Sequence, residues 1–435
     1  MTSIVRPRKT SVKMNFVRND SKIGISIPGH FQCPISLELM KDPVTLSTGI
    51  TYDRQSIERW LETGGRTCPV SNKVLKEGDE EEEMIPNHSI RRMIQDWCVA
   101  NKAYGIERIP TPRTPVTREI VEEMLSKIRM ASREGDRNRC SCLVQKMVVT
   151  AKESQRNRRL IREGGAAQTL SMSFENFAGV SVESLGNGVS EEILSALTML
   201  FPLDKEVLRH VGSPESMNCI VSILNFGSLT GRLNAALVVK ELVSSGREYL
   251  IAETQGLVEA LTKLIREPVS PQTTKASLIA VFYMVRSDEK VASQFADMNL
   301  ASLIVEKLVD SDRSMCEKSL AVLDGVFGSE NGREKGCKHA LTVPVLVKKM
   351  FRVSEMATEF AVSALWRLCK NDAGEVGCLI EAVQVGAFQK LLLLLQVGCS
   401  EGTKEKASEL LKLMNGYREW ECIETMDFKG LKRPF

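Results

Sequence analysis

The sequence predicts an α-helical solenoid that follows a small mixed α+β domain. Three observations lead to this prediction. A helical pattern of apolar residues recurs about every 42 residues over most of the 435-residue chain. A segment with Pro, Gly, short apolar runs and two helical stretches precedes these repeats. A Pro-containing stretch lies between the two regions, as expected of a linker.

The composition is that of an ordinary soluble protein, with 43% apolar and 26% charged residues. The net charge of +3 is small for this length, so the composition disfavours nucleic-acid binding. The longest compact apolar cluster, Leu391–Val397, is much shorter than the ~20 residues of a membrane-spanning helix. The twelve Cys are scattered, form no Cys-x-x-Cys pair and follow no apolar leader, which predicts reduced thiols. We therefore expect a cytoplasmic protein without a transmembrane segment, with the nucleus as an alternative location.

The chain divides into four regions. Residues 1–27 are basic and polar and predict a flexible tail, whereas residues 28–101 contain the small domain. Residues 102–117 contain Pro110, Pro112 and Pro115, which favour an extended linker. Residues 118–425 carry the helical repeats.

The repeats share one helical motif, in which a lead residue is followed by apolar residues at positions +3, +4 and +7. The lead residues are Cys140, Ile193, Ala235, Ser277, Ser319, Ala361 and Ala407. From Ile193 to Ala361 the spacing is 42 residues four times in succession, and the flanking intervals are 53 and 46 residues. This period is typical of armadillo or HEAT repeats, in which each apolar face is buried against the next repeat.

Several repeats contain a second helical pattern. One runs over Leu257–Ile265 after Gly256, and another runs over Ala387–Leu395 after Gly386. Each Gly is suited to the turn that separates two helices. Pro202 lies inside the second repeat, where we expect it to end or kink a helix.

The small domain has the layout of a metal-binding domain without the ligands. A zinc cross-brace requires eight ligands, commonly arranged as Cys-x-x-Cys pairs. Ahead of the last helical stretch of this domain, which contains Cys98, the residues that can bind a soft metal are His30, Cys33, Cys68 and His88. Ser36 and Ser71 stand where the second thiolate of each pair would be. We therefore expect no metal and no cofactor, and a single improvised site built from these four residues is the alternative.

Two helices are expected in this domain, over Gln55–Leu61 and Ser89–Ala100. Asp53 and Ser89 are residues of the type that caps helix N-termini, so we expect them to cap these helices. Cys33 and Cys68 each precede Pro and have no nearby His with an acidic partner. We therefore expect structural thiols rather than catalytic nucleophiles.

The order of five short motifs in this domain is specific. They are Cys-Pro-Ile-Ser, Asp-Pro-Val, Gly-Ile-Thr-Tyr-Asp-Arg, Cys-Pro-Val-Ser and Ile-Pro-Asn. Over about 70 residues this order resembles the U-box, the zinc-free relative of the RING domain. The resemblance implies that hydrogen bonds and salt bridges replace the metals, and the candidates for this network are Ser36, Thr48, Tyr52, Asp53, Arg54 and Ser71.

The repeat region resembles armadillo repeats, and residues 157–170 look like the end of one such repeat. The expected fold is therefore an armadillo-repeat solenoid preceded by a zinc-free, RING-like U-box domain. That combination resembles the plant U-box/armadillo E3 ubiquitin ligases, and the resemblance spans roughly 390 of the 435 residues.

The resemblance implies a function. The U-box would dock a ubiquitin-conjugating enzyme (E2) that carries ubiquitin, and would promote transfer to substrate lysines without a nucleophile or a covalent ubiquitin intermediate of its own. Carried over from the family pattern, the E2-binding residues are Ile35, Leu37, Trp60 and Pro69. Asn72 takes the position at which family members often have Arg or Lys to bridge E2 and ubiquitin. The armadillo repeats would recruit the protein substrate.

Three alternatives stay open at this point. Leu37 and Trp60 can instead belong to the core of the small domain. The chain can be an armadillo scaffold whose U-box is weak or inactive towards E2, and the missing charge at Asn72 is the feature that points this way. The U-box can also mediate a homo- or hetero-oligomer. A pure transport or cytoskeletal adaptor leaves residues 28–100 unexplained.

Overall fold

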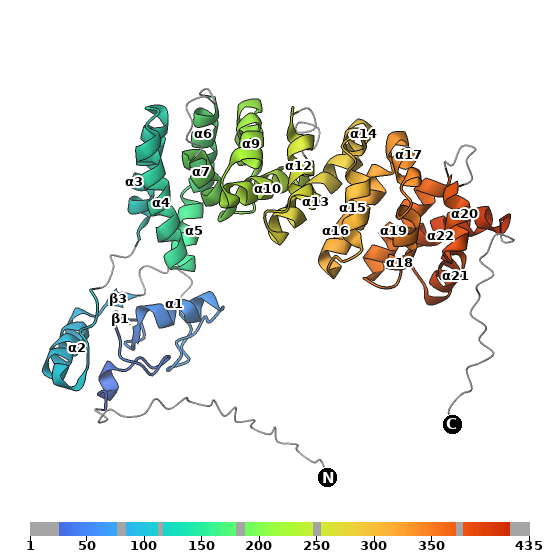
Figure 1. Ribbon diagram of the computed structural model, residues 1–435. Coiled ribbons are helices and arrows are strands. Elements are labelled where there is room, and N and C mark those ends of the chain that lie inside the picture. The colour runs from blue at the N-terminus through green and yellow to red at the C-terminus, as the bar shows by residue number, and fades with distance from the viewer. Residues whose placement is uncertain are drawn as a thin grey trace, which may run out of the picture. The chain divides into compact units, whose positions relative to one another are not determined.

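The structure is a computed structural model that describes residues 26–75, 84–111, 116–179, 188–246, 254–370 and 377–417. The chain forms two compact units, Met1–Val116 and Thr117–Phe435 (Figure 1). Most of the tail predicted at residues 1–27 lies outside the described residues. The same holds for Pro112 and Pro115 of the predicted linker, and for the last residues of the predicted solenoid, 418–425.

The first unit is a small sheet packed with two helices. After the 3-10 turn η1 (Gly29–Phe31) come the strands β1 (Pro43–Thr45), β2 (Thr51–Asp53) and β3 (Ile85–Pro86) and the helices α1 (Arg54–Glu62), α2 (His88–Ala100) and η2 (Lys102–Tyr104). The strands form an antiparallel sheet in the order β2-β1-β3, with Val44 opposite Tyr52 on one side and Pro86 on the other. Val44, Tyr52 and Ile94 are fully buried, so sheet and α2 share one core.

Neither of the two predicted helix caps, Asp53 and Ser89, makes the capping hydrogen bond expected of it. The N-cap of α2 is Asn87, whose side-chain oxygen accepts a hydrogen bond from the Ile90 N–H at 2.9 Å, and Ser89 lies inside the first turn. The Asn87 amide also donates to Thr45 Oγ1 at 3.1 Å, which ties the start of α2 to the sheet. Asp53 does occupy the N-cap position of α1, but its side chain makes no capping hydrogen bond.

The second unit is a succession of helices that lie side by side (Figure 1). Its described helices are α3 (Arg118–Arg133), α4 (Arg137–Glu153), α5 (Gln155–Glu163), α6 (Ala166–Ala178), α7 (Gly188–Thr198), α8 (Lys205–Val211), α9 (Pro214–Phe226), α10 (Leu229–Ser244), α12 (Leu257–Arg266), α13 (Pro271–Ser287), α14 (Glu289–Asp297), α15 (Leu300–Leu308), α16 (Arg313–Val326), α17 (Glu330–Lys338), α18 (Thr342–Lys349), α19 (Glu355–Lys370), α20 (Gly377–Gln384), α21 (Ala387–Val397) and α22 (Glu401–Asn415). The predicted helical solenoid is confirmed.

The predicted period corresponds to one row of helices. The seven motifs fall on α4, α7, α10, α13, α16, α19 and α22, which we call the repeat row, and each of these helices packs against the next. All seven lead residues are buried. Close approach requires small residues, as at Gly325 of α16, where a Cβ atom would lie 2.2 Å from Val285 of α13. The period therefore reflects the burial of each helix against its neighbours.

The secondary helical patterns are also confirmed. The stretch from Leu257 forms α12 and the stretch from Ala387 forms α21. Gly256 and Gly386 precede them with φ near +80°, a left-handed conformation that glycine adopts without steric cost. Helix α7 ends at Thr198, four residues before Pro202.

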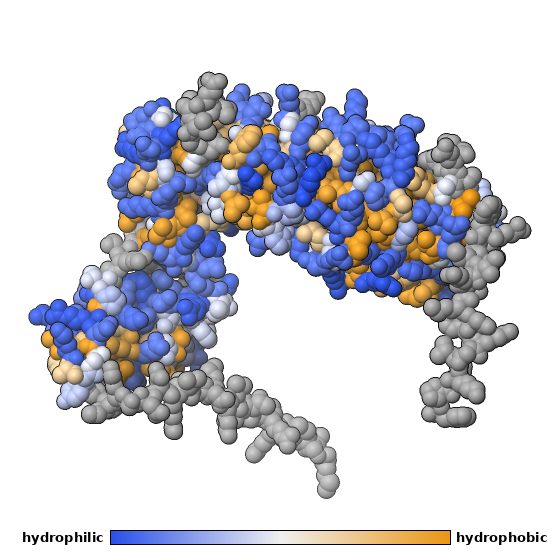
Figure 2. All heavy atoms as spheres, in the orientation of Figure 1, coloured by the Kyte–Doolittle hydropathy of each residue, from blue (hydrophilic) through white to orange (hydrophobic). Residues whose placement is uncertain are grey.

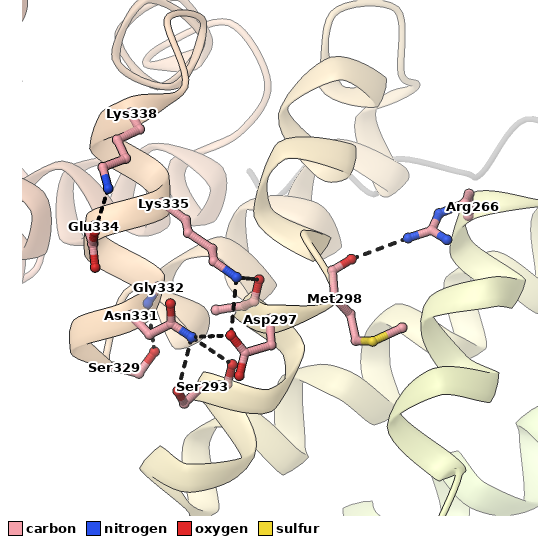
Figure 3. Close-up of polar contacts among 11 residues, drawn as sticks. Arg266, Ser293, Asp297, Met298, Ser329, Asn331, Gly332, Glu334, Lys335 and Lys338 are labelled. Atoms are coloured by element: carbon pink, nitrogen blue, oxygen red, sulfur yellow. Dashed lines mark hydrogen bonds and ion pairs between the residues drawn. The ribbon is translucent and has the colours of Figure 1, made fainter.

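Polar contacts between neighbouring repeats supplement the apolar packing (Figure 3). Asn331 on α17 donates to Asp297 Oδ1 on α14 at 2.8 Å, and Lys335 contacts the same carboxylate at 3.2 Å. The Arg266 guanidinium of α12 donates to the Met298 carbonyl at 3.2 Å. These contacts join residues 32 to 38 positions apart, so they link successive repeats.

Within the part of the chain that the structure describes, no single helix has the length and hydropathy to cross a membrane. Helices α20 and α21 have this length and hydropathy only when they are taken together, and the pair bends by 70° at its connection.

Candidate functional site

The first unit builds the same tight loop twice. In the first loop, residues 33–38, the Cys33 N–H donates to the Glu38 carbonyl and the Leu37 N–H donates to the Cys33 carbonyl, both at 2.8 Å. Leu37 has φ of 60°, in the left-handed region. A non-glycine residue is uncommon there, and Asn and Asp tolerate it better than Leu does.

The second loop, residues 68–73, repeats this pattern. The Cys68 N–H donates to the Lys73 carbonyl and the Asn72 N–H donates to the Cys68 carbonyl, again both at 2.8 Å. Asn72 has φ of 55°. The two Cys-Pro-x-Ser motifs therefore form equivalent turns, and their fifth residues, Leu37 and Asn72, occupy the same backbone conformation.

The sulfur of Cys68 is the centre of a hydrogen-bond network. It is hydrogen-bonded to the Tyr52 hydroxyl at 3.0 Å and accepts from Thr48 Oγ1 at 3.4 Å. The Val70 N–H donates to the Tyr52 oxygen at 3.3 Å. Burial raises the pKa of the Cys68 thiol, but the nearby Ser71, Thr48 and Tyr52 hydroxyls outweigh burial and lower the pKa to about 6. Ser71 Oγ is buried and makes no hydrogen bond of ordinary geometry among the described residues. It nevertheless lies close enough to the Cys68 sulfur to stabilise the thiolate form of Cys68.

This network changes one expectation. The sequence shows no His with an acidic partner near Cys68, and we expected an ordinary structural thiol. The Ser71 hydroxyl belongs to the same motif, and folding brings two further hydroxyls to the sulfur from 16 and 20 positions away. Cys68 is nevertheless 0% exposed, which is the position of a structural thiol rather than of a nucleophile.

The Asp53 carboxylate holds the start of β1. Its Oδ1 accepts hydrogen bonds from the N–H groups of Lys41 at 2.8 Å and Asp42 at 2.9 Å. Asp42 in turn forms a salt bridge with Arg54, whose Nε lies 2.6 Å from Asp42 Oδ2. The Asp53 N–H donates to Cys33 Sγ at 3.3 Å. These contacts explain why the Asp53 side chain does not cap α1: the carboxylate satisfies two other backbone donors.

Burial raises the pKa of the Cys33 thiol, but backbone N–H groups and the Ser56 hydroxyl outweigh this effect and lower the pKa below its ordinary value.

Ser36, the remaining member of the expected network, is exposed, and its Oγ accepts only a long contact of 3.4 Å from the Glu38 N–H. Thr48, Tyr52 and Ser71 therefore gather at the Cys68 sulfur, and the Asp53 N–H lies at the Cys33 sulfur. Arg54 pairs with Asp42, and the Ser36 side chain belongs to neither sulfur network.

Sequence reasoning missed Ser56, whose hydroxyl acts on Cys33, and two further polar residues of the domain. Asp42 forms the salt bridge with Arg54, and Asn87 connects α2 to β1. Both residues lie in motifs that carried the resemblance, Asp-Pro-Val and Ile-Pro-Asn. The signal was therefore present, but the motif alone did not show what the side chains contact.

The two loops display apolar side chains. Leu37 is 69% exposed and Val70 is 53% exposed, while Ile35 and Pro69 are half-buried. Ile35 packs partly against the core of the domain. Leu37 thus lies outside the core. Val70, which sequence reasoning did not single out, adds to the apolar surface of the second loop.

Trp60 of α1 is 37% exposed and is held against residues 65–67, which lead into the second loop. Its indole Nε1–H donates to the Thr67 carbonyl at 2.9 Å. Gly65 packs against the ring so closely that a Cβ atom would lie 2.4 Å from Trp60 Nε1. Trp60 is therefore fixed in orientation while part of its surface stays open to a partner.

Asn72 is exposed at the end of the second loop. The described residues contain no group of three or more His, Cys, Asp or Glu that is arranged to hold a metal ion. The two loops and Trp60 each present exposed apolar side chains on a hydrogen-bonded support, as expected of residues that dock a partner.

Comparison with known proteins follows the same division of the chain. Residues 27–103 match the U-box domain, and residues 120–432 match the ARM repeat region of plant U-box proteins. U-box domain-containing protein 21 of Arabidopsis thaliana is 43% identical over 433 residues, which cover 98% of each chain. E3 ubiquitin-protein ligase PUB22 of the same plant is 32% identical, and the match covers 92% of this chain and 97% of that protein.

E3 ubiquitin-protein ligase PUB23 of Arabidopsis thaliana is 34% identical, with 89% and 93% coverage. Among solved structures, an engineered protein has a TM-score of 0.52 at 16% identity and covers 68% of each chain. That likeness concerns the fold alone.

Proposed function

Since this chain belongs to the plant U-box proteins with an ARM repeat region, a membership that supports E3 ubiquitin ligase function, we propose that its U-box docks a ubiquitin-charged E2 through the two loops and α1. The E2 contacts are Ile35, Leu37, Trp60 and Pro69, as the family pattern implies, together with Val70. The armadillo repeats recruit the protein substrate.

Leu37 is the observation that carries this proposal. A left-handed backbone costs a residue such as Leu roughly 1–2 kcal/mol, and an apolar side chain that is 69% exposed recovers little of that cost by burial. The equivalent position of the second loop has Asn, which tolerates this conformation better. A strained, exposed Leu is explained if its side chain is buried by a partner.

The proposed mechanism is positioning. The U-box fixes the E2 so that the ubiquitin thioester and the substrate lysine meet in a reactive geometry. Neither Cys of the two loops acts as a nucleophile, because Cys33 and Cys68, in spite of their lowered pKa, are both 0% exposed. Ubiquitin then passes directly from E2 to substrate without a covalent intermediate on the U-box.

Asn72 is proposed to contact both E2 and ubiquitin. It is exposed, and its position in the second loop is fixed by the backbone hydrogen bond to Cys68. Its amide can donate a hydrogen bond, but it lacks the charge that would strengthen that bond. This missing charge favours the second candidate function, a scaffold whose U-box activates E2 weakly or not at all.

Discharge of ubiquitin from a panel of charged E2 enzymes to free lysine separates the two functions. For a ligase, the full chain accelerates discharge with at least one E2, and Ile35→Ala removes the acceleration. For a scaffold, no E2 responds. Non-reducing gels of the same reactions test the mechanism, since a reductant-sensitive ubiquitin adduct that disappears in Cys68→Ser would contradict direct transfer.

A homo- or hetero-oligomer through the U-box remains a proposal, and sedimentation equilibrium of the full chain tests it.

The substrate role of the repeats is tested by capture with the full chain and with Ile35→Ala. Both should retain the same protein substrates, because Ile35 lies in the U-box and not in the repeats, whereas Ile35→Ala should lose the E2.

A further inference from the structure

The second unit exposes apolar side chains at many places, and such exposure alone does not identify a binding site. In the face drawn in Figure 2, hydrophobic residues gather over α16, α18 and α19, whereas the upper rim of the solenoid is mostly hydrophilic. A cavity that combines apolar walls with a few polar groups is a more specific feature. The second unit contains such a cavity, of about 430 Å³, between two successive repeats.

The cavity lies where α12 and α15 end and where α13 and α16 begin. Its walls include Ile265 of α12, Leu278 of α13 and Ile304 of α15, all of which are buried. Turn residues such as Val269 and Ser311 also line it, so it belongs to the edge of the solenoid. A volume of about 430 Å³ is of the size of small-molecule sites.

One buried polar side chain of the cavity lacks a partner. Ser319 of α16 is 4% exposed and lines the cavity, and its hydroxyl makes no hydrogen bond among the residues that the structure describes. Ser277 is the equivalent residue of the preceding repeat, 42 positions earlier. The Ser277 hydroxyl also has no partner there, but it is enclosed by protein and does not line the cavity. Ser319 therefore offers a ligand a hydrogen bond that Ser277 does not.

Lys307 of α15 brings an ammonium group to the cavity. Its equivalent one repeat later is Lys349 of α18, whose Nζ lies 3.5 Å from the Val309 carbonyl and 3.4 Å from Cys316 Sγ. The ammonium of Lys349 is therefore used within the protein. Lys307 is half-buried, and its ammonium has no hydrogen bond or ion pair within the described part of the chain. It is available to a ligand.

Two carboxylates also line the cavity and oppose an anionic ligand. Asp312 forms a salt bridge with Lys275 at 3.3 Å, and its other oxygen accepts a hydrogen bond from the Met315 N–H at 2.7 Å. These two partners offset its charge. Asp310 is exposed, so water and salt screen its charge more than that of the half-buried Lys307.

The charges beside the lining add little. Arg313 forms a salt bridge with Glu317 at 3.4 Å. Arg266 and Glu267 are adjacent in the chain and have opposite charges. The Glu306 carboxylate faces a histidine of the next repeat at 3.8 Å. The strongest charge inside the cavity is therefore that of the Lys307 ammonium.

We propose that this cavity binds a small carboxylic acid with a compact apolar body. The carboxylate accepts hydrogen bonds from the Lys307 ammonium, and the apolar body contacts the buried walls. The Ser319 hydroxyl offers a further hydrogen bond. A charge-assisted hydrogen bond is stronger than a neutral one, so the carboxylate should determine specificity. The proposal does not rest on the ligase function, because all lining residues belong to the second unit.

The test is a ligand-observed NMR titration of the full chain with three probes of similar shape. The probes are phenylpropanoate, phenylpropanamide and phenylpropylamine. The carboxylate should bind with a dissociation constant on the order of 1 mM, as expected of so small a ligand. It should bind at least about fivefold more tightly than the amide. The amine should bind most weakly, because its charge has the same sign as that of Lys307.

Two pairs of variants assign the contacts. Lys307→Met keeps an unbranched side chain without the charge, so it should remove the preference for the carboxylate over the amide. Lys349→Met is the matched control and should leave both affinities unchanged, because its ammonium contacts Val309 and Cys316 instead. Ser319→Ala should weaken binding of the carboxylate by about threefold, whereas Ser277→Ala should have no effect.

Hydrogen exchange of the full chain locates the bound probe. Saturating phenylpropanoate should slow exchange in residues 265–278 and 304–319 and leave residues 33–38 and 68–73 unchanged. No binding, equal binding of the carboxylate and the amide, or an unchanged preference in Lys307→Met would overturn the proposal. Tighter binding of the carboxylate by Lys307→Met would also overturn it, because Lys307 would then fill the cavity itself.

Discussion

Replacement of Leu37 separates backbone strain from docking. Leu37→Ala and Leu37→Asn both remove the exposed apolar side chain, but only Asn tolerates the left-handed conformation that φ of 60° imposes. Both variants should therefore dock E2 more weakly, whereas the Asn variant should be the more stable of the two. The comparison needs no assumption about the small part of the side chain that is buried, because both variants lose it.

The size of each effect follows from the structure. Full burial of a Leu side chain is worth about 1.5–3 kcal/mol, and 69% of this one is still open to a partner. Docking should therefore weaken by about 1–2 kcal/mol, or roughly fivefold to thirtyfold. The backbone term should make Leu37→Asn more stable than Leu37→Ala by about 1 kcal/mol.

Two assays on the full chain measure these quantities. Discharge of a charged E2 to free lysine, followed as a function of chain concentration, reports docking. Hydrogen exchange of amides in residues 26–75 and 84–111 reports the local stability of the first unit, and 1 kcal/mol corresponds to about fivefold slower exchange. Val99→Ala, an exposed apolar residue of α2, is the control and should leave discharge unchanged.

Two results would refute this reasoning. Normal discharge by both Leu37 variants would remove Leu37 from the docking surface. Faster exchange in Leu37→Asn than in Leu37→Ala would show that the backbone of the first loop is not strained.

Further predictions concern the two sulfur networks and the second loop. Tyr52→Phe should destabilise the first unit by about 1–3 kcal/mol in urea unfolding, because Cys68 Sγ and the Val70 N–H both lose a buried partner. Asp53→Ala should destabilise it by about 2–3 kcal/mol because two N–H groups lose their acceptor, while Asp96→Ala at an exposed position of α2 should leave the melting temperature unchanged. The Cys68 thiolate should titrate near pH 6, as absorbance near 240 nm will show when the unaltered chain is compared with Cys68→Ser. The pKa of Cys68 in the folded state lies below its unfolded value of about 8.5, so the unfolded state binds more protons between pH 6 and pH 8.5. The free energy of unfolding should therefore rise from pH 6 to pH 8.5 by up to about 1.4 kcal/mol per pH unit. This contribution should be lost as the pH falls from 8.5 through 6. Asn72→Arg should accelerate discharge and Asn72→Ala should slow it, and no effect from either would exclude a bridging role.

The solenoid was predictable because its signal is periodic. The lead residues from Ile193 to Ala361 are spaced evenly, and each is buried for the same reason, the packing of one row helix against the next. Gly256 and Gly386 added a local signal, because the turns before α12 and α21 need φ near +80°.

The details of the small domain were less predictable, because several residues compete for one role. Asn87 and Ser89 are both suitable N-caps, and the contact of Asn87 with Thr45 across the sheet decides between them. Asp53 stands at a capping position, but backbone donors from Lys41 and Asp42 take its carboxylate instead. Neither outcome is visible without the tertiary contacts.

Long-range geometry also accounts for the properties of the two loops. The low pKa of Cys68 depends on the hydroxyl of Ser71 in its own motif and also on hydroxyls from Thr48 and Tyr52, which are distant in sequence. The equivalence of Leu37 and Asn72 lies in their backbone angles, which the residue types do not reveal. The Cys-Pro-x-Ser repeat indicated related loops, but only the structure shows that one of them holds a strained, exposed Leu.

The most direct test of E2 docking is hydrogen exchange of the full chain with and without an E2 that carries ubiquitin through a stable oxyester. The account predicts slower exchange in peptides that cover residues 33–38, the end of α1 and residues 68–73, with little change in the repeats. Unchanged exchange in both loops at a saturating conjugate concentration, or protection confined to residues 117 and beyond, would contradict it.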